Sequence, residues 1–122
     1  MSLRDALHKA VASQEQVEAD EEREHALRSS GCVPVASVAD RRRASVSGVL
    51  RSVTLRPREG VPALEAELYD GSGTVDLVWL GRRSIGGVEP GRRLRAEGLV
   101  CSLEGRPTIY NPRYELRPLS GE

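Results

Sequence analysis

The sequence contains no phenylalanine, and aromatic residues make up only 3% of its 122 positions. A hydrophobic core must therefore be built from aliphatic side chains, and the place of each aromatic residue becomes informative. The aromatic residues are Tyr69, Trp79, Tyr110 and Tyr114. Alternation along the chain predicts that Trp79 belongs to the core or to the mouth of a barrel.

Cysteine and histidine are also scarce. Cys32, Cys101, His8 and His25 show no metal-ligand spacing, so we expect neither a metal site nor a cofactor. No set of nucleophile, base and orienting group can be argued from the sequence, and we expect no enzymatic activity. Isolated thiols fit a reducing cytoplasm. No apolar run reaches about 18 residues, so we expect no signal peptide and no membrane span.

Lysine is almost absent, since Lys9 is the only one and every other basic residue is an arginine. Arginine holds phosphate with a planar fork and stacks on bases, although a GC-rich genome would produce the same bias. The charges are divided unevenly. Residues 1–40 carry four basic and eight acidic residues (4 − 8 = −4), and residues 41–122 carry fourteen and ten (14 − 10 = +4). This division indicates an anionic partner for the basic part, an acidic arm that docks on it, or simply a solvated surface.

Residues 1–30 are predicted to form a helical acidic arm. Leu3, Leu7 and Val11 recur at helical spacing, and Ser13 with Gln16 is typical of a capping box. The apolar face of this arm is thin. We therefore expect a solvated arm, or one that binds a protein partner or a second copy of the chain.

The rest of the chain has the pattern of short strands separated by turns. Leu64, Ala66 and Leu68 alternate with Glu65, Glu67 and Tyr69, as in a half-buried strand, and Val75, Leu77 and Trp79 alternate with Thr74, Asp76 and Val78. Gly48 lies inside the first strand, where it predicts a bulge or a sharp bend. Pro112 has no N–H for a sheet ladder, so it must lie at an edge or a bulge.

The order of these signals predicts a fold. Five strands, joined by an Arg-rich loop, an Asp-Gly-Ser-Gly turn, a short connector and a Glu-Gly turn, are typical of an OB-type Greek-key barrel. The predicted class is all-β, a five-stranded OB-fold barrel with a helical N-terminal arm. The predicted divisions are an arm over 1–30, a linker over 31–42, the barrel over 43–118 and a tail over 119–122.

Four short motifs occur in an order that one lineage shares. They are Val46-Ser47-Gly48-Val49, Leu68-Tyr69-Asp70-Gly71-Ser72-Gly73-Thr74-Val75, Val88-Glu89-Pro90-Gly91 and Asn111-Pro112-Arg113-Tyr114. Over about residues 41–118 the chain resembles the OB-fold nucleic-acid-binding domains of the tRNA-anticodon type. It is similar to the wedge domain of RecG-type branch-migration helicases and looks most like small stand-alone OB proteins of actinobacteria. The resemblance implies binding of DNA or RNA without catalysis.

An OB barrel normally holds its ligand across strands 2 and 3, between the loops that join strands 1–2 and 4–5. Candidate phosphate contacts and stacking residues follow from this placement. They are Arg51, Arg56, Arg58, Tyr69, Arg106, Tyr110 and Arg113. The loop arginines either follow a phosphate backbone or only keep the barrel soluble. Tyr69 either stacks on a base or packs on a loop.

Three carboxylates oppose this interpretation, because Glu65, Glu67 and Asp76 share the outward side of the same two strands. The nucleic-acid interpretation depends on the rim arginines outweighing them. Alternatively, a ligand lies beside strands 4 and 5, where several arginines cluster. These are Arg92, Arg93, Arg95 and Arg113.

These observations predict a non-catalytic protein of the cytoplasm that binds single-stranded or structured DNA or RNA with low sequence specificity. It would serve as an accessory factor in DNA repair, recombination or RNA handling. The alternative is a protein–protein interaction module that binds no nucleic acid.

Overall fold

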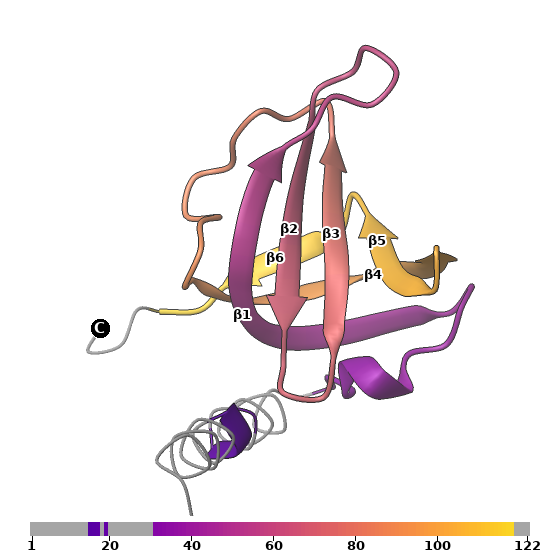
Figure 1. Cartoon of the computed structure of the whole chain (residues 1–122), viewed down its shortest axis with the longest axis vertical. Coiled ribbons are helices and arrows are strands. Elements are labelled where there is room, and N and C mark those ends of the chain that lie inside the picture. Colours follow the sequence, from indigo (N-terminus) through magenta and orange to yellow (C-terminus); the bar gives the residue numbers. More distant parts are fainter. Residues whose placement is uncertain (1–14, 18, 20–30, 119–122) are drawn as a thin grey trace, which may run out of the picture.

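The computed structural model describes residues 15–17, 19 and 31–118. One turn of 3-10 helix, η1 (Val35–Ser37), precedes six strands (Figure 1). The strands are β1 (Arg43–Leu55), β2 (Ala63–Tyr69), β3 (Thr74–Leu80), β4 (Arg93–Leu103), β5 (Arg106–Tyr110) and β6 (Arg113–Leu116). The predicted arm over 1–30 lies almost wholly outside the described residues, although residues 15–17 and 19 are helical. The predicted tail over 119–122 lies outside them as well.

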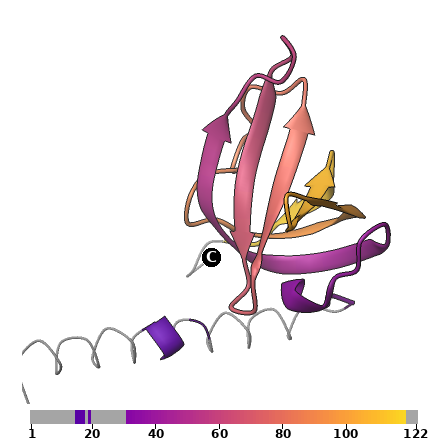
Figure 2. The same ribbon diagram turned by 45° about the vertical axis from the view of Figure 1, so that its right-hand side comes forward.

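The sheet closes on itself through five strands. Strands β1, β2, β3, β5 and β4 follow one another as hydrogen-bonded neighbours, and β4 pairs with β1 to complete the ring (Figures 1 and 2). The β3–β5 pairing is parallel and the other pairings are antiparallel. The predicted five-stranded closed sheet is therefore confirmed.

The last strand expected from the sequence is divided into β5 and β6. The division falls at Asn111, which has a left-handed φ of 49°, and at Pro112. Beyond it, β6 pairs only with β4 among the described strands and lies outside the ring. Pro112 thus lies between two strands, because it has no N–H to give to either ladder.

Strand β1 is long and sharply bent (Figure 1). It pairs with β4 from Arg43 to Val49 and with β2 from Val49 to Leu55, so it changes partners at Val49. Gly48 permits this change, because a Cβ there would lie 2.8 Å from the carbonyl carbon of Tyr69. The sequence prediction of a bend at Gly48 is confirmed. The bulge, however, lies at Arg51, where the register shifts between Leu50 and Ser52.

The core lies inside the ring and is almost entirely aliphatic, as the absence of phenylalanine requires. Alternate residues of each strand point inward and are buried. The largest are Val46, Leu50, Leu68, Val75, Leu77, Leu94, Val100 and Ile109. Trp79 is 5% exposed and packs with this group, so its predicted core position is confirmed.

The segment before β1 is attached to the sheet by a buried carboxylate. Asp70 accepts a hydrogen bond of 2.8 Å from the N–H of Val35 and further bonds from Ser72 and Gly73. Val35 is consequently buried beneath the β2–β3 turn. Within the described residues, no helix is long and apolar enough to cross a membrane.

Candidate nucleic-acid interface

A groove of about 560 Å³ runs over the outer face of β2 and β3. One end is bounded by the β1–β2 loop and the other by the turn between β4 and β5. Its lining comes from both loops and from β1, β2, β3, β4 and β5. The lining residues are Ser52, Thr54, Arg56, Arg58, Glu65, Ala66, Glu67, Asp76, Leu103, Glu104, Arg106, Thr108 and Tyr110. The groove thus lies where the OB fold normally holds a ligand.

The alternation of β2 and β3 places three carboxylates on the floor of the groove. Glu65 and Glu67 alternate with buried Ala66 and Leu68 on β2, and Asp76 lies opposite Glu67 on β3. Their side chains therefore point away from the core. The outward direction predicted from the sequence is confirmed for all three.

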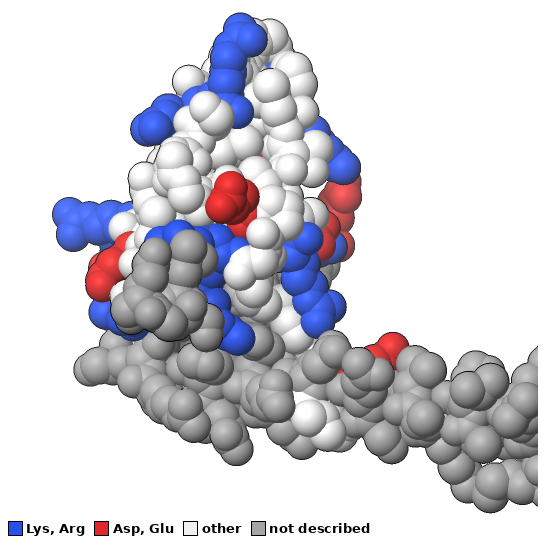
Figure 3. Space-filling model, turned by 90° about the vertical axis from the view of Figure 1, so that its left-hand side faces the viewer, with Lys and Arg blue, Asp and Glu red and all other residues white. Residues whose placement is uncertain are grey.

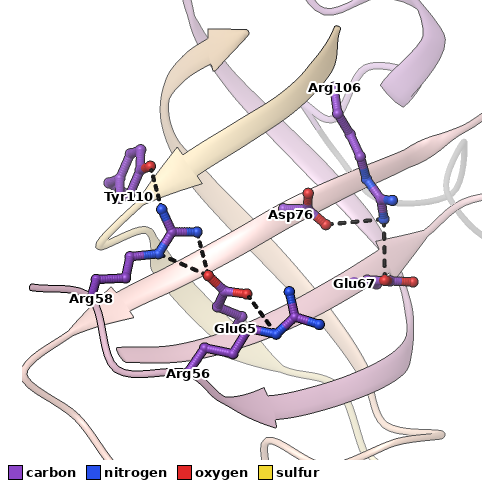
Figure 4. A network of polar contacts seen from close by, with 7 residues as sticks. All are labelled: Arg56, Arg58, Glu65, Glu67, Asp76, Arg106 and Tyr110. Atoms are coloured by element: carbon purple, nitrogen blue, oxygen red, sulfur yellow. Dashed lines mark hydrogen bonds and ion pairs between the residues drawn. The ribbon is translucent and has the colours of Figure 1, made fainter. Parts of the chain in front are cut away.

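The arginines of the β1–β2 loop reach down to one of these carboxylates (Figure 4). Arg58 donates to Glu65 through two nitrogens, Nε and Nη2, which share the acceptor Oε1, and the Nε–Oε1 distance is 2.9 Å. Arg56 Nε lies 3.8 Å from the other oxygen of Glu65. Arg58 also donates a 3.3 Å hydrogen bond to the hydroxyl of Tyr110 on β5. The hydrogen bond to Glu65 raises the pKa of Arg58.

Arg106 forms the second network, at the other side of the groove (Figure 4). Its guanidinium lies 3.0 Å from Asp76 and 3.4 Å from Glu67. Burial raises the pKa of Asp76, and the neighbouring Glu67 and Glu65 act in the same direction, whereas Arg106 opposes them. The surroundings of Asp76 therefore disfavour its negative charge, although Arg106 partly compensates.

The balance of charge in the groove differs from the expectation. Three of its lining residues are arginines and four are acidic, so the formal sum is −1 (3 − 4). The prediction that rim guanidiniums outweigh the carboxylates is wrong for the groove itself. The alternation along β2 and β3 correctly placed three carboxylates on this face, but Glu104 of the β4–β5 turn adds a fourth. These arginines also face carboxylates rather than open solvent alone.

Arg51 and Tyr69 meet at another place, at the end of β2. The guanidinium carbon of Arg51 lies 3.5 Å from the centroid of the Tyr69 ring. Neither residue belongs to the groove lining. Tyr69 is half-buried and Arg51 is exposed. Tyr69 therefore packs against an arginine of β1, rather than on a loop.

Arg113 is not brought to the groove. It lies on β6, opposite Glu97 of β4, and lines a separate hollow of about 140 Å³ with Arg95, Tyr114 and Glu115. Its neighbours thus include two carboxylates. The structure brings together Arg56, Arg58, Arg106 and Tyr110 from the predicted set, and it separates Arg51 with Tyr69 and Arg113 from them.

Other arginines lie around the start of β4. The backbones of Arg92 and Arg93 are joined to those of Leu50 and Arg117 by hydrogen bonds. Figure 3 shows the side of the molecule that carries the β3–β4 connection, with several basic side chains and few acidic ones among the described atoms. Of the arginines expected to cluster beside strand 4, Arg95 and Arg113 line one hollow, which shares no residue with the groove.

Sequence reasoning missed the roles of Glu65 and of the Arg58–Tyr110 contact. Glu65 binds two arginines of one loop, and Arg58 and Tyr110 are 52 residues apart. No local pattern marks either contact, because the partners come from different strands. Within the described part of the chain, no cluster of three or more metal-ligating side chains occurs.

Comparisons with known proteins support the architecture. No family model and no curated protein matches the sequence. A solved structure of RecG bound to a three-way DNA junction is similar over 74% of this chain and 13% of that one, with 22% identity and a TM-score of 0.59. A replication factor A related protein from Methanobacterium thermoautotrophicum is similar over 70% of this chain and 90% of that one, with 11% identity and a TM-score of 0.54. The closed sheet and these likenesses show the OB fold.

Proposed function

We propose that this protein binds single-stranded or structured nucleic acid along the groove over β2 and β3. The observation that carries the proposal is the position of Arg56, Arg58, Arg106 and Tyr110 around one groove between the two loops. This is the face on which OB folds hold oligonucleotides. One similar structure is that of RecG bound to a DNA junction and the other is that of a protein related to replication factor A, which agrees with the proposal.

By count the groove arginines do not outweigh its carboxylates, so binding depends instead on ion pairs that are partly exposed and can be replaced. The side chains of Arg56 and Arg58 are 70% and 43% exposed, and exposed pairs contribute only about 0–1 kcal/mol. A phosphate can take the place of a carboxylate, since both accept the same two-pronged hydrogen bonds from arginine. The displaced carboxylates stay in the groove and repel the bound nucleic-acid strand. We therefore expect modest affinity that depends strongly on salt.

Low sequence specificity follows from the same contacts. Arginine–phosphate bonds position a strand but carry no sequence information. The groove offers Tyr110 as its aromatic ring for a base. We propose a non-catalytic accessory role in DNA repair, recombination or RNA handling, in the cytoplasm, where the free Cys32 and Cys101 stay reduced.

The proposal is tested by titrating labelled single-stranded, duplex, three-way-junction and RNA oligonucleotides at low and moderate salt. The Arg56→Ala and Arg58→Ala double variant should bind more weakly, and its log affinity should fall less steeply with log salt, by about 0.7 for each phosphate that the variant no longer binds. The double variant of Arg82→Ala and Arg83→Ala is the matched control, because these exposed arginines lie outside the groove. Absence of binding by the unmodified protein at low salt would refute the proposal.

A second function is favoured by the charge balance of the groove. A surface with nearly equal numbers of arginines and carboxylates complements a protein surface of mixed charge better than it complements a polyanion. A co-purifying protein that is released by Arg106→Ala, together with no oligonucleotide binding, would support a protein-interaction module. An interaction through the arm over residues 1–30 stays a prediction, since the arm lies almost wholly outside the described residues.

A further inference from the structure

The bulge in β1 directs one arginine onto an aromatic ring. Leu50 pairs with Leu68 and Ser52 pairs with Glu67, so Arg51 is an extra residue with no partner on β2. A bulge turns the side chain of the extra residue away from the direction that a regular strand would give it. Here the guanidinium of Arg51 comes to lie over Tyr69.

The guanidinium lies over the face of the ring. Its central carbon is 3.5 Å from the ring centroid, which is contact distance for two stacked planes. An edge-on guanidinium would bring its nitrogens into the ring at this separation. By comparison, the guanidinium carbon of Arg58 is 5.8 Å from the centroid of Tyr110. Of these two arginines, only Arg51 presents a planar cation with a ring directly behind it.

Arg51 also differs from the groove arginines in its charged neighbours. Among the described residues it forms no ion pair, whereas Arg56, Arg58 and Arg106 each face at least one carboxylate. Its side chain is exposed, so the face of the guanidinium that points away from Tyr69 is open to a ligand. No carboxylate has to be displaced before that face is used.

The pair lies on the path of a strand that leaves the groove. The side chain of Tyr69 lies on the same outward face of β2 as those of Glu65 and Glu67, which line the groove. Tyr69 is two residues beyond Glu67 along this strand. Two residues of a strand span about 7 Å, which a nucleotide chain can bridge. The pair therefore continues the groove surface toward the bend of β1.

We propose that Arg51, supported from behind by Tyr69, is a stacking platform for one nucleobase of the bound strand. The base lies on the open face of the guanidinium, as bases do on planar arginine side chains. Tyr69 is then a positioning residue, which holds the guanidinium flat and does not itself touch the base. This inference rests on the proposed function, because the groove must deliver the strand to the platform.

The test uses the full chain and two labelled single strands of equal length and charge, a thymidine oligomer and its abasic counterpart. We expect the unmodified protein to bind the thymidine strand about tenfold more tightly, since stacking of one base contributes about 1–3 kcal/mol. Arg51→Lys keeps the charge but removes the plane. It should lower the preference for the thymidine strand to the part that Tyr110 of the groove provides and leave the abasic affinity nearly unchanged.

Two variants of Tyr69 separate support from direct stacking. Tyr69→Phe keeps the ring beneath Arg51 and should retain the preference for bases, whereas Tyr69→Leu should abolish most of it. Arg42→Lys is the matched control, because it makes the same exchange at an exposed arginine before β1. Its affinities should equal those of the unmodified protein.

The outcomes distinguish the two proposals. If Arg51→Lys keeps the full preference for bases, the platform is refuted while groove binding stands. If Arg51→Ala keeps the preference and Tyr69→Leu removes it, the base stacks on Tyr69 directly and the proposed role of Arg51 is wrong. If the unmodified protein binds neither strand at low salt, the proposed function fails and the platform fails with it.

Discussion

The groove and the Arg51–Tyr69 platform use the same residue type in opposite settings. In the groove, Arg58 and Arg106 are held by carboxylates of the floor, so a phosphate must replace an existing partner. At the platform, Arg51 is held by an uncharged ring and keeps an open face. An arginine count therefore says little about affinity for a polyanion, because the partner that each guanidinium already has decides what it can bind.

The largest effect that we predict is a loss of stability at the bend of β1. The Arg51–Tyr69 platform depends on this bend. Gly48→Ala places a Cβ against the backbone carbonyl of Tyr69, and a backbone atom cannot move aside cheaply. We expect the free energy of unfolding to fall by about 3 kcal/mol. The fluorescence of Trp79, which is the only tryptophan and is 5% exposed, reports unfolding in urea.

The matched control for this change is Gly86→Ala, because a Cβ at Gly86 meets no atom within 4 Å. Its stability should stay within about 0.5 kcal/mol of the unmodified protein. Equal stability of the two variants would contradict the close approach of β1 and β2 at Gly48.

The next effect concerns the carboxylate that holds two arginines. Glu65→Gln removes the negative charge beside Arg56 and Arg58 and leaves both guanidiniums available to phosphate. Oligonucleotide affinity at low salt should rise about tenfold, which corresponds to about 1.4 kcal/mol. The preference for thymidine over abasic strands should not change, since the platform contains no carboxylate.

Glu89→Gln is the control for charge alone, because Glu89 is exposed and lies outside the groove lining. An equal rise in both variants would show that net charge, and not release of the loop arginines, governs binding. Unchanged affinity in Glu65→Gln would place the nucleic acid away from the groove.

The smallest effect is a pH dependence that belongs to the groove and not to the platform. Burial raises the pKa of Asp76 above its ordinary value of 3.8, so lowering the pH neutralises this groove carboxylate early. A bound polyanion favours the neutral form further, so binding takes up protons and tightens as the pH falls. As the pH is lowered from neutral toward the raised pKa of Asp76, we expect the affinity to increase by about two- to threefold.

Asp76→Asn should remove at least part of this increase. The contribution of Asp76 to the free energy of unfolding changes with pH in the same direction as the affinity, and both rise as the pH falls. A folded pKa that is raised above the unfolded one means that protonation of Asp76 favours the folded state, and this contribution grows as the pH falls through the raised pKa. An identical pH profile of binding in Asp76→Asn would contradict the assignment.

Local patterns were sufficient for most of the fold. Alternation along β2 and β3 predicted which side chains point into the core, and Trp79 is among them as expected, but Val78 on the other side of β3 is buried as well. Gly48 predicted the bend of β1 because a missing Cβ has a direct steric consequence. The division between β5 and β6 was anticipated only in part, through Pro112, because the left-handed conformation of Asn111 leaves no clear mark in the sequence.

The sequence predicted four residues that line the groove, but not how they are arranged there. Arg56, Arg58, Arg106 and Tyr110 meet at one groove because the OB topology brings their loops and strands together. The separation of Arg113 depends on β6 pairing with β4, which no spacing in the sequence specifies.

The inward and outward faces of each strand and the positions of the turns follow from local sequence, since both depend on neighbouring residues and on backbone sterics. The partner of each arginine is fixed only in the folded chain. Arg58 meets Tyr110 across 52 residues, and Arg51 meets Tyr69 because a bulge turns it there. Such contacts depend on strand register and on one extra residue in β1, and neither is a property of any short stretch of sequence.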